Sequence, residues 1–110
     1  MKKALFLALL VFPMISYGKV DLCSCVSFLR SVSDYQPPQV DYAFEIPIIS
    51  KIPTPNSIAI FSYKPFGHVA LVTEVGTSTI TVLESNFFGC WINKRVVDMK
   101  NVFLKGYYRY

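Results

Sequence analysis

FGHVALVTEV (66–75), the polar linker GTST and ITVLESN (80–86) follow one another in the second half of this chain. Both longer segments are rich in β-branched residues, and the linker supplies a glycine and small polar residues, a combination typical of a β-hairpin. In an antiparallel pair, the first residue of one strand lies opposite the last residue of its partner. We therefore expect His68, the single histidine of the sequence, to lie near Glu84 and Asn86.

A helix is predicted before this hairpin, at residues 21–33. Its apolar side chains at helical spacing are Cys25, Phe28, Leu29 and Val32. Either Asp21 or Ser24 is a suitable N-cap, and both choices place Cys25 in the first turn. There the unpaired N–H groups and the helix dipole favour a thiolate. Taken alone, Cys25 would be interpreted as a small core residue, but a histidine that can serve as its base favours a nucleophile.

The rest of the chain predicts an irregular segment and three more strands. Two prolines at 37–38 should end the helix, and Pro47 makes residues 43–49 an edge or covering segment rather than a central strand. The apolar segment 58–63, which follows a turn, is predicted in the interior of the sheet. The other predicted strands are 90–97 and 104–110. One helix followed by a mostly antiparallel sheet is an α+β fold.

The first 18 residues are organised like a secretory signal peptide. Two lysines precede an apolar run at 4–12, and small residues flank Tyr17 before the expected cleavage site after Gly18. We therefore predict a signal peptide at 1–18 and a single domain at 19–110. The protein is then expected to be secreted or to reside in the periplasm or cell envelope.

Two other interpretations of the N-terminal segment fit the sequence less well. The apolar run is shorter than the roughly 20 residues that span a bilayer, and Pro13 follows it, which disfavours a transmembrane anchor. Cys23 is preceded by Leu22, whereas lipoprotein processing expects a small residue at that position. We expect no stable membrane insertion once the signal peptide has been removed.

The charge balance gives no indication of a nucleic-acid partner. The chain has 11 basic and 7 acidic residues, and cleavage after Gly18 would remove two of the basic ones, leaving a formal charge of +2. The remaining lysines and arginines are scattered along the sequence, so we expect no binding to nucleic acid.

The three cysteines are an odd number for a protein exported to an oxidising compartment. Any single disulfide among Cys23, Cys25 and Cys90 leaves one thiol that is either reactive or paired with another chain. One Cys-x-Cys, one distant cysteine and one histidine lack the paired spacings of structural zinc sites, so no metal is predicted. No phosphate-binding glycine loop is present, and no cofactor is implied.

Several segments resemble the CHAP domains, a family of cysteine, histidine-dependent amidohydrolases and peptidases. The similar segments are CVSFLR (25–30), PNSIAIF (55–61), GHVALV (67–72), LESN (83–86) and the closing GYY (106–108). The resemblance implies a papain-like α+β fold, with a nucleophile helix before a mostly antiparallel sheet. It also implies cleavage of amide bonds in the peptide part of bacterial peptidoglycan. The related NlpC-type peptidases use a second histidine at a place that Ile80 occupies here, so the CHAP interpretation is preferred.

The resemblance also implies roles for individual residues. It makes Cys25 the nucleophile and His68 the general base and acid. Glu84 and Asn86 would orient the imidazole or complete the polar site. Glu84 is the stronger candidate for stabilising the imidazolium, because a carboxylate accepts a charge-assisted hydrogen bond. The candidate substrate-binding residues are Trp91, Phe66 and Ser24, the last through its hydroxyl in the oxyanion site.

The pairing of the cysteines and the activity remain alternatives at this point. If Cys25 is reserved as the nucleophile, Cys23 and Cys90 are expected to pair with each other if they are oxidised at all. The predicted function is that of an exported cysteine amidase or endopeptidase. The alternatives are a CHAP-like envelope or virion interaction protein without catalysis, and a thiol redox protein that uses Cys23 and Cys25.

Overall fold

The computed structural model describes residues 21–33, 40 and 42–109. The predicted signal peptide at 1–18 and the proline pair at 37–38 lie outside these residues. Within the described part of the chain, no helix has the length and apolar character needed to cross a membrane.

The predicted helix is present as α3, Cys25–Val32. Ser24 is its N-cap, with an extended backbone and a hydroxyl that accepts a hydrogen bond from the Ser27 N–H at 3.1 Å. Asp21, the other candidate cap, instead accepts a hydrogen bond from the Cys23 N–H at 2.9 Å. The helix therefore begins at Cys25, in the middle of the segment predicted to be helical.

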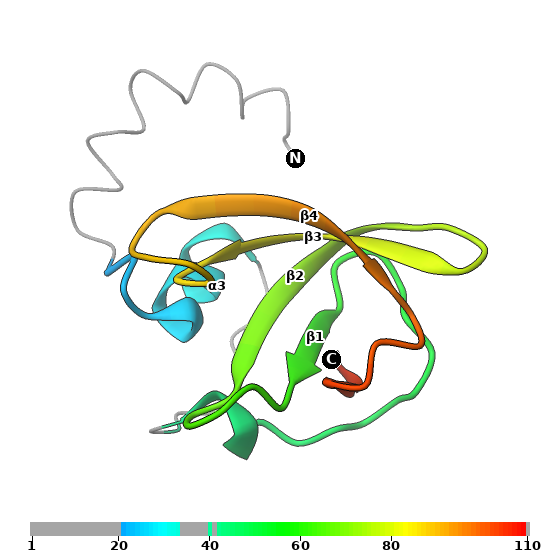
Figure 1. Cartoon of the computed structure of the whole chain (residues 1–110), viewed down its shortest axis with the longest axis horizontal. Coiled ribbons are helices and arrows are strands. Elements are labelled where there is room, and N and C mark those ends of the chain that lie inside the picture. The colour runs from blue at the N-terminus through cyan, green and yellow to red at the C-terminus, as the bar shows by residue number, and fades with distance from the viewer. Residues whose placement is uncertain (1–20, 34–39, 41, 110) are drawn as a thin grey trace.

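Five antiparallel strands follow the helix and form one sheet in the order β4-β3-β2-β1-β5 (Figure 1). They are β1 (Ile58–Phe61), β2 (His68–Val75), β3 (Thr79–Ser85), β4 (Ile92–Asp98) and β5 (Leu104–Tyr108). β1 lies between β2 and β5 and is buried at every position, so the predicted interior strand is confirmed. One helix before an antiparallel sheet confirms the α+β class.

The segment 43–49 packs against β1 and β2 through its 3-10 helix and reaches the edge strand β5 at its end, without forming a strand of its own. It contains the short 3-10 helix η1, Ala43–Glu45, and then buries Ile46 against the core. Ser50 forms an isolated antiparallel bridge with Tyr107 of β5. This arrangement agrees with the prediction of an edge or covering segment.

Each face of the sheet carries its own apolar cluster. The cluster beneath α3 contains Leu29, Ala43, Ile46, Ile58, Ile60, Val69 and Leu71. The cluster on the opposite face contains Ala59, Phe61, Ala70, Val72, Ile80, Val82, Val97 and Tyr107. Because neighbouring side chains of a strand point to opposite faces, the inner strands bury both sets and have near-continuous apolar sequences.

The β2–β3 hairpin contains a β-bulge on β2. Thr81 and Val82 are neighbours on β3, whereas their partners Glu74 and Val72 on β2 are separated by Thr73. Thr73 is thus the extra residue that one strand carries and the other does not. It changes the register between the tip of the hairpin and its base.

The register at the base of the hairpin determines which side chains meet. Leu71 pairs with Leu83 there, and Leu71 belongs to the cluster beneath α3. His68 lies three residues before Leu71 on β2, and Glu84 lies one residue after Leu83 on β3. Since side chains alternate along a strand, His68 and Glu84 share the face opposite α3.

Candidate active site

Cys25 is the first residue of α3 and its thiol is free and partly exposed. The helix packs against β2 and β3, which brings its first turn close to the base of the hairpin (Figure 1). The thiol interacts with the imidazole of His68, and this interaction favours the charged form of the ring. A thiol at a helix N-terminus with an interacting histidine is the arrangement of an activated nucleophile.

His68 opens β2 and is buried, with 5% of its surface exposed. The loop before it turns at Gly67, whose φ of 80° lies in the left-handed region that favours glycine. Nε2 of His68 and Oε1 of Glu84 are 2.8 Å apart. An ionised carboxylate can only accept hydrogen bonds, so Nε2 donates and Nδ1 is left for the thiol of Cys25.

Glu84 is completely buried at the end of β3. In addition to the contact with His68, it accepts a hydrogen bond from Asn93 Nδ2 at 2.8 Å. Arg95 contacts both of its oxygens, through Nε at 2.6 Å and through Nη2 at 3.2 Å. A buried carboxylate requires such partners, because leaving it unpaired in the interior would be costly.

The electrostatic environment favours a charged pair of His68 and Glu84. Burial of the imidazole lowers the pKa of His68, but hydrogen bonds and charge interactions with Cys25 and Glu84 outweigh it and raise the pKa above its usual 6.5. Burial raises the pKa of Glu84, but the hydrogen bonds from His68 and Arg95 outweigh it and hold that pKa below its usual 4.5. Both shifts stabilise an imidazolium beside a carboxylate.

Asn86 does not direct its amide to the imidazole. Its Nδ2 donates to the backbone oxygen of Cys23 at 2.9 Å, and its φ of 61° turns the chain out of the strand that carries Glu84. Of the two residues predicted near His68, Glu84 is therefore the one that contacts the ring. Asn86 contacts the segment that leads into the nucleophile helix.

Cys23 and Cys90 form a disulfide, as expected for the two cysteines that remain beside Cys25. The disulfide joins the residues before α3 to the loop between β3 and β4. Ser85 adds a hydrogen bond from its hydroxyl to the backbone oxygen of Ser24 at 3.3 Å. Since Cys23 is already paired with Cys90, a redox couple of Cys23 with Cys25 is disfavoured.

The three predicted substrate-binding residues differ in their surroundings. Ser24 uses its hydroxyl oxygen to cap the helix. Phe66 is 54% exposed and stacks on Tyr42 with ring centroids 5.0 Å apart. Trp91 is 55% exposed and lies next to Cys90 in the chain, with its ring close to Gly89. Contact of these residues with a substrate stays a prediction.

Asn93 and Arg95 contact Glu84 but were not predicted as site residues, and Arg95 counted only among the scattered basic residues. Both belong to β4, where Glu84 pairs with Asn93 and Val82 pairs with Arg95. The alternation of the strand was the available signal, because it places positions 93 and 95 on the same face as Glu84. That signal could be used only with the β3–β4 register in hand.

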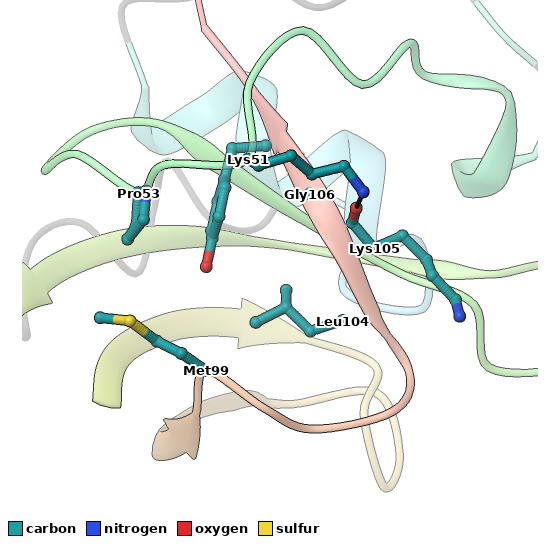
Figure 2. Close-up of a pocket in the computed structure, with 7 residues that line it drawn as sticks. Lys51, Pro53, Met99, Leu104, Lys105 and Gly106 are labelled. Carbon is teal, nitrogen blue, oxygen red and sulfur yellow. Dashed lines mark hydrogen bonds between the residues drawn. The ribbon is translucent and has the colours of Figure 1, made fainter. Parts of the chain in front are cut away.

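The two best-defined pockets of the described residues lie away from the Cys25–His68 site. In the described residues, no group of three or more His, Cys, Asp or Glu side chains converges on a point. A pocket of about 140 Å³ lies along β5 and the loops beside it (Figure 2). It is lined by Lys51, Pro53, Met99, Leu104, Lys105, Gly106 and Tyr107, and none of these is a residue of the Cys25–His68 site.

The chain matches the family model of the CHAP domain over residues 18–86, which is more than half of its length. The protein therefore belongs to the CHAP family of cysteine, histidine-dependent amidohydrolases and peptidases. In general, a CHAP domain indicates an amidase or peptidase that hydrolyses peptidoglycan. The match includes α3 and the β2–β3 hairpin, which carry Cys25, His68 and Glu84.

A solved structure supports the fold independently. The crystal structure of Ly7917 is similar with a TM-score of 0.59 and 17% sequence identity, covering 77% of this chain and 52% of Ly7917. The present chain thus spans about half the length of that protein. No curated protein matches the sequence.

Proposed function

We propose that this protein is an exported cysteine amidase or endopeptidase with a papain-like fold that cleaves amide bonds in the peptide part of bacterial peptidoglycan. The observation that carries the proposal is the 2.8 Å hydrogen bond between the His68 imidazole and the buried carboxylate of Glu84, with the Cys25 thiol interacting with the same imidazole. A nucleophile, a base and an orienting group are all present, which is the minimum set for thiol acyl transfer.

Acylation follows from this geometry. His68 accepts the thiol proton of Cys25, and the sulfur attacks the carbonyl carbon of the scissile amide. Glu84 stabilises the imidazolium that forms, because it is held against Nε2. When the C–N bond breaks, the imidazolium gives its proton to the departing amine, and a thioester joins the substrate acyl group to Cys25.

Deacylation uses the same groups in the reverse sense. His68 takes a proton from water, the resulting hydroxide attacks the thioester, and the sulfur leaves and regains its proton from the imidazolium. The product is a carboxylic acid. We expect the backbone N–H of Cys25 to stabilise the oxyanion of both tetrahedral intermediates, because the first N–H groups of a helix have no partner within it.

Cell-wall zymography tests the activity. We expect the full chain, with its disulfide intact, to clear a gel that contains bacterial cell walls, and we expect Cys25→Ala to abolish the clearing. Mass spectrometry of the released fragments then shows which amide is cut. Ser78→Ala is a suitable control, since Ser78 is exposed at the far tip of the β2–β3 hairpin. A folded wild-type protein that releases no fragment would favour the non-catalytic interaction protein.

Alkylation provides a test that requires no substrate. Because Cys23 and Cys90 are paired, brief treatment with iodoacetamide under non-reducing conditions should modify Cys25 first. Peptide mapping locates the adduct. Preferential modification of Cys90 would contradict both the disulfide and the assignment of the nucleophile.

A further inference from the structure

Among the residues around Glu84 that have no role in the proposed mechanism, Arg95 makes the most hydrogen bonds to the carboxylate. Its guanidinium donates to both carboxylate oxygens, from Nε to Oε2 at 2.6 Å and from Nη2 to Oε1 at 3.2 Å. The side chain of Arg95 is 19% exposed and that of Glu84 is fully buried. This side-on, two-point contact fixes the plane of the carboxylate as well as its position.

Aromatic rings hold the guanidinium in turn. Its central carbon lies 3.7 Å from the ring centroid of Phe87, and the rings of Phe61 and Tyr63 are 5.0 Å and 5.8 Å away. Nη1 also donates to the Tyr63 hydroxyl at 3.3 Å. The same three rings surround the imidazole of His68, with centroids 5.7 to 6.1 Å from it. Arg95 and His68 are therefore packed in one aromatic enclosure on either side of Glu84.

We propose that Arg95 is a positioning residue that acts through Glu84: by holding both carboxylate oxygens, it keeps the acceptor for His68 Nε2 in place through the whole reaction cycle. The inference rests on the proposed function for its catalytic consequence. The geometric part, a three-residue array of His68, Glu84 and Arg95, stands on the contacts alone.

The need for such a residue follows from the cycle itself. His68 is protonated after thiol activation and neutral again after protonating the leaving amine, so its own charge cannot hold Glu84 at every step. A fully buried carboxylate without a constant cation would tend to take up a proton or turn away from the ring. Arginine keeps its charge at every working pH and offers a rigid pair of donors, which lysine does not.

The sign of the effect on His68 follows from the groups that face it. Cys25 from α3 and Glu84 from β3 interact with His68 directly, and the ring of Tyr63 packs near it. Arg95 from β4 and the neutral Asn93 contact Glu84 and act on His68 through it. Arg95 is the only permanent cation among them. Removing it should therefore raise the proton affinity of both Glu84 and His68.

The single histidine makes a direct test possible. The full chain without a polyhistidine tag gives one set of imidazole signals, and their NMR titration reports the pKa of His68 without any need for activity. We expect Arg95→Met to raise that pKa by about one unit, as the loss of a nearby charge generally does. Arg95→Lys, which keeps the charge, should titrate close to the wild type. Lys94→Met is the matched control, because Lys94 is exposed on the other face of β4.

Kinetics then separate positioning from charge. Arg95→Met should lower kcat about tenfold with little change in KM and should move the pH profile of kcat to higher pH. Arg95→Lys should recover the pH profile but only part of kcat, because lysine holds one oxygen rather than two. If Arg95→Met does not fold, as judged by thermal unfolding, Arg95→Lys decides by itself: a wild-type kcat in that variant overturns the two-point role.

Two further outcomes are decisive. A folded Arg95→Met with the wild-type titration of His68 would overturn the inference, because the charge would then not reach the imidazole. A wild-type protein that hydrolyses no peptidoglycan, combined with the expected titration shifts, would instead reject the proposed function while supporting the array.

Discussion

The two sides of the site are held together by different means. On the side of the base, His68 and Glu84 are buried and Arg95 is partly buried, and charged hydrogen bonds join them across three neighbouring strands. On the side of the nucleophile, the residues before Cys25 are partly exposed and are tied to the β3–β4 loop by the disulfide of Cys23 and by neutral hydrogen bonds.

Because the two sides are held together differently, they should respond to different conditions. A buried charge network changes with pH and with the removal of a single charge, and salt screens it only weakly. A disulfide at an exposed loop is insensitive to pH over the same range and responds to reduction. We therefore expect a change that disrupts the base to leave the nucleophile in place, and the reverse. The following variants test this separation, from the largest expected effect to the smallest.

The largest effect is expected for Glu84→Gln. It leaves the half-buried guanidinium of Arg95 without its counter-charge, and breaking such a pair typically costs about 3–5 kcal/mol of folding free energy. Turnover should fall sharply, and the acidic limb of its pH profile should shift, because the imidazolium loses its partner. Urea denaturation and pH-dependent hydrolysis measure the two effects, and Glu74→Gln on the exposed part of β2 is the control.

The opposite result would reassign the orienting role. If Glu84→Gln retained full turnover and an unchanged pH profile while Asn86→Ala abolished turnover, Asn86 would be the residue that serves His68. The observed hydrogen bond of Asn86 to Cys23 would then have to exchange during catalysis.

Removal of the disulfide by the double variant Cys23→Ala/Cys90→Ala should have the next largest effect. The bond closes a loop with a sequence separation of 67, and losing such a bond costs about 2–5 kcal/mol in small exported domains. Turnover should fall because the entry to α3 is no longer fixed. A reductant should lower the stability of the wild type and leave that of the double variant unchanged. Equal sensitivity of both proteins to reductant would contradict the predicted role.

The pH dependence of stability should show a maximum set by the base side. The pKa of Glu84 is lowered by folding, so its contribution is present above pH 4.5 and is lost as the pH falls through its folded-state pKa. The pKa of His68 is raised, so its contribution is complete below pH 6.5 and is lost as the pH rises through its folded-state pKa. Urea denaturation should therefore show the highest free energy of unfolding between pH 4.5 and pH 6.5. In Glu84→Gln, this maximum should disappear.

The smallest effect is expected at Asn86. Two variants separate the contribution of its side-chain hydrogen bond from that of its backbone conformation. Asn86→Ala keeps the β-carbon and removes the amide with its hydrogen bond to Cys23, a loss of about 1 kcal/mol. Asn86→Gly removes the same hydrogen bond and also the β-carbon, which relieves the left-handed backbone at a φ of 61° and offsets part of that loss. Turnover should fall a few-fold with the shape of its pH profile unchanged. A shifted profile in Asn86→Gly would place this residue on the base side instead.

The sequence was sufficient for those features that local pattern determines. Helical spacing identified α3, and alternation with turn chemistry identified the strands and the meeting of His68 with Glu84. The choice between two candidate caps was not determined by pattern, because Asp21 and Ser24 are both good capping residues and only the observed backbone selects Ser24.

What the sequence could not supply depends on contacts between distant elements. Arg95 acquires its role only when β4 pairs with β3, and Asn86 loses its expected contact because the chain turns at that residue. The bulge at Thr73 also has no local signature, since threonine is an ordinary strand residue.

That single extra residue has a consequence for how the sheet assembles. Without Thr73, the pairing at the hairpin tip, where Val75 faces Ile80, would continue to the base of the hairpin. There it would be one position out of phase with the observed register. Glu84 would then point among the aliphatic side chains beneath α3, a carboxylate with no cation to meet it, at a cost of several kcal/mol. The contacts of the site thus favour one strand register: the chain reaches a stable sheet only in the alignment that also assembles the site.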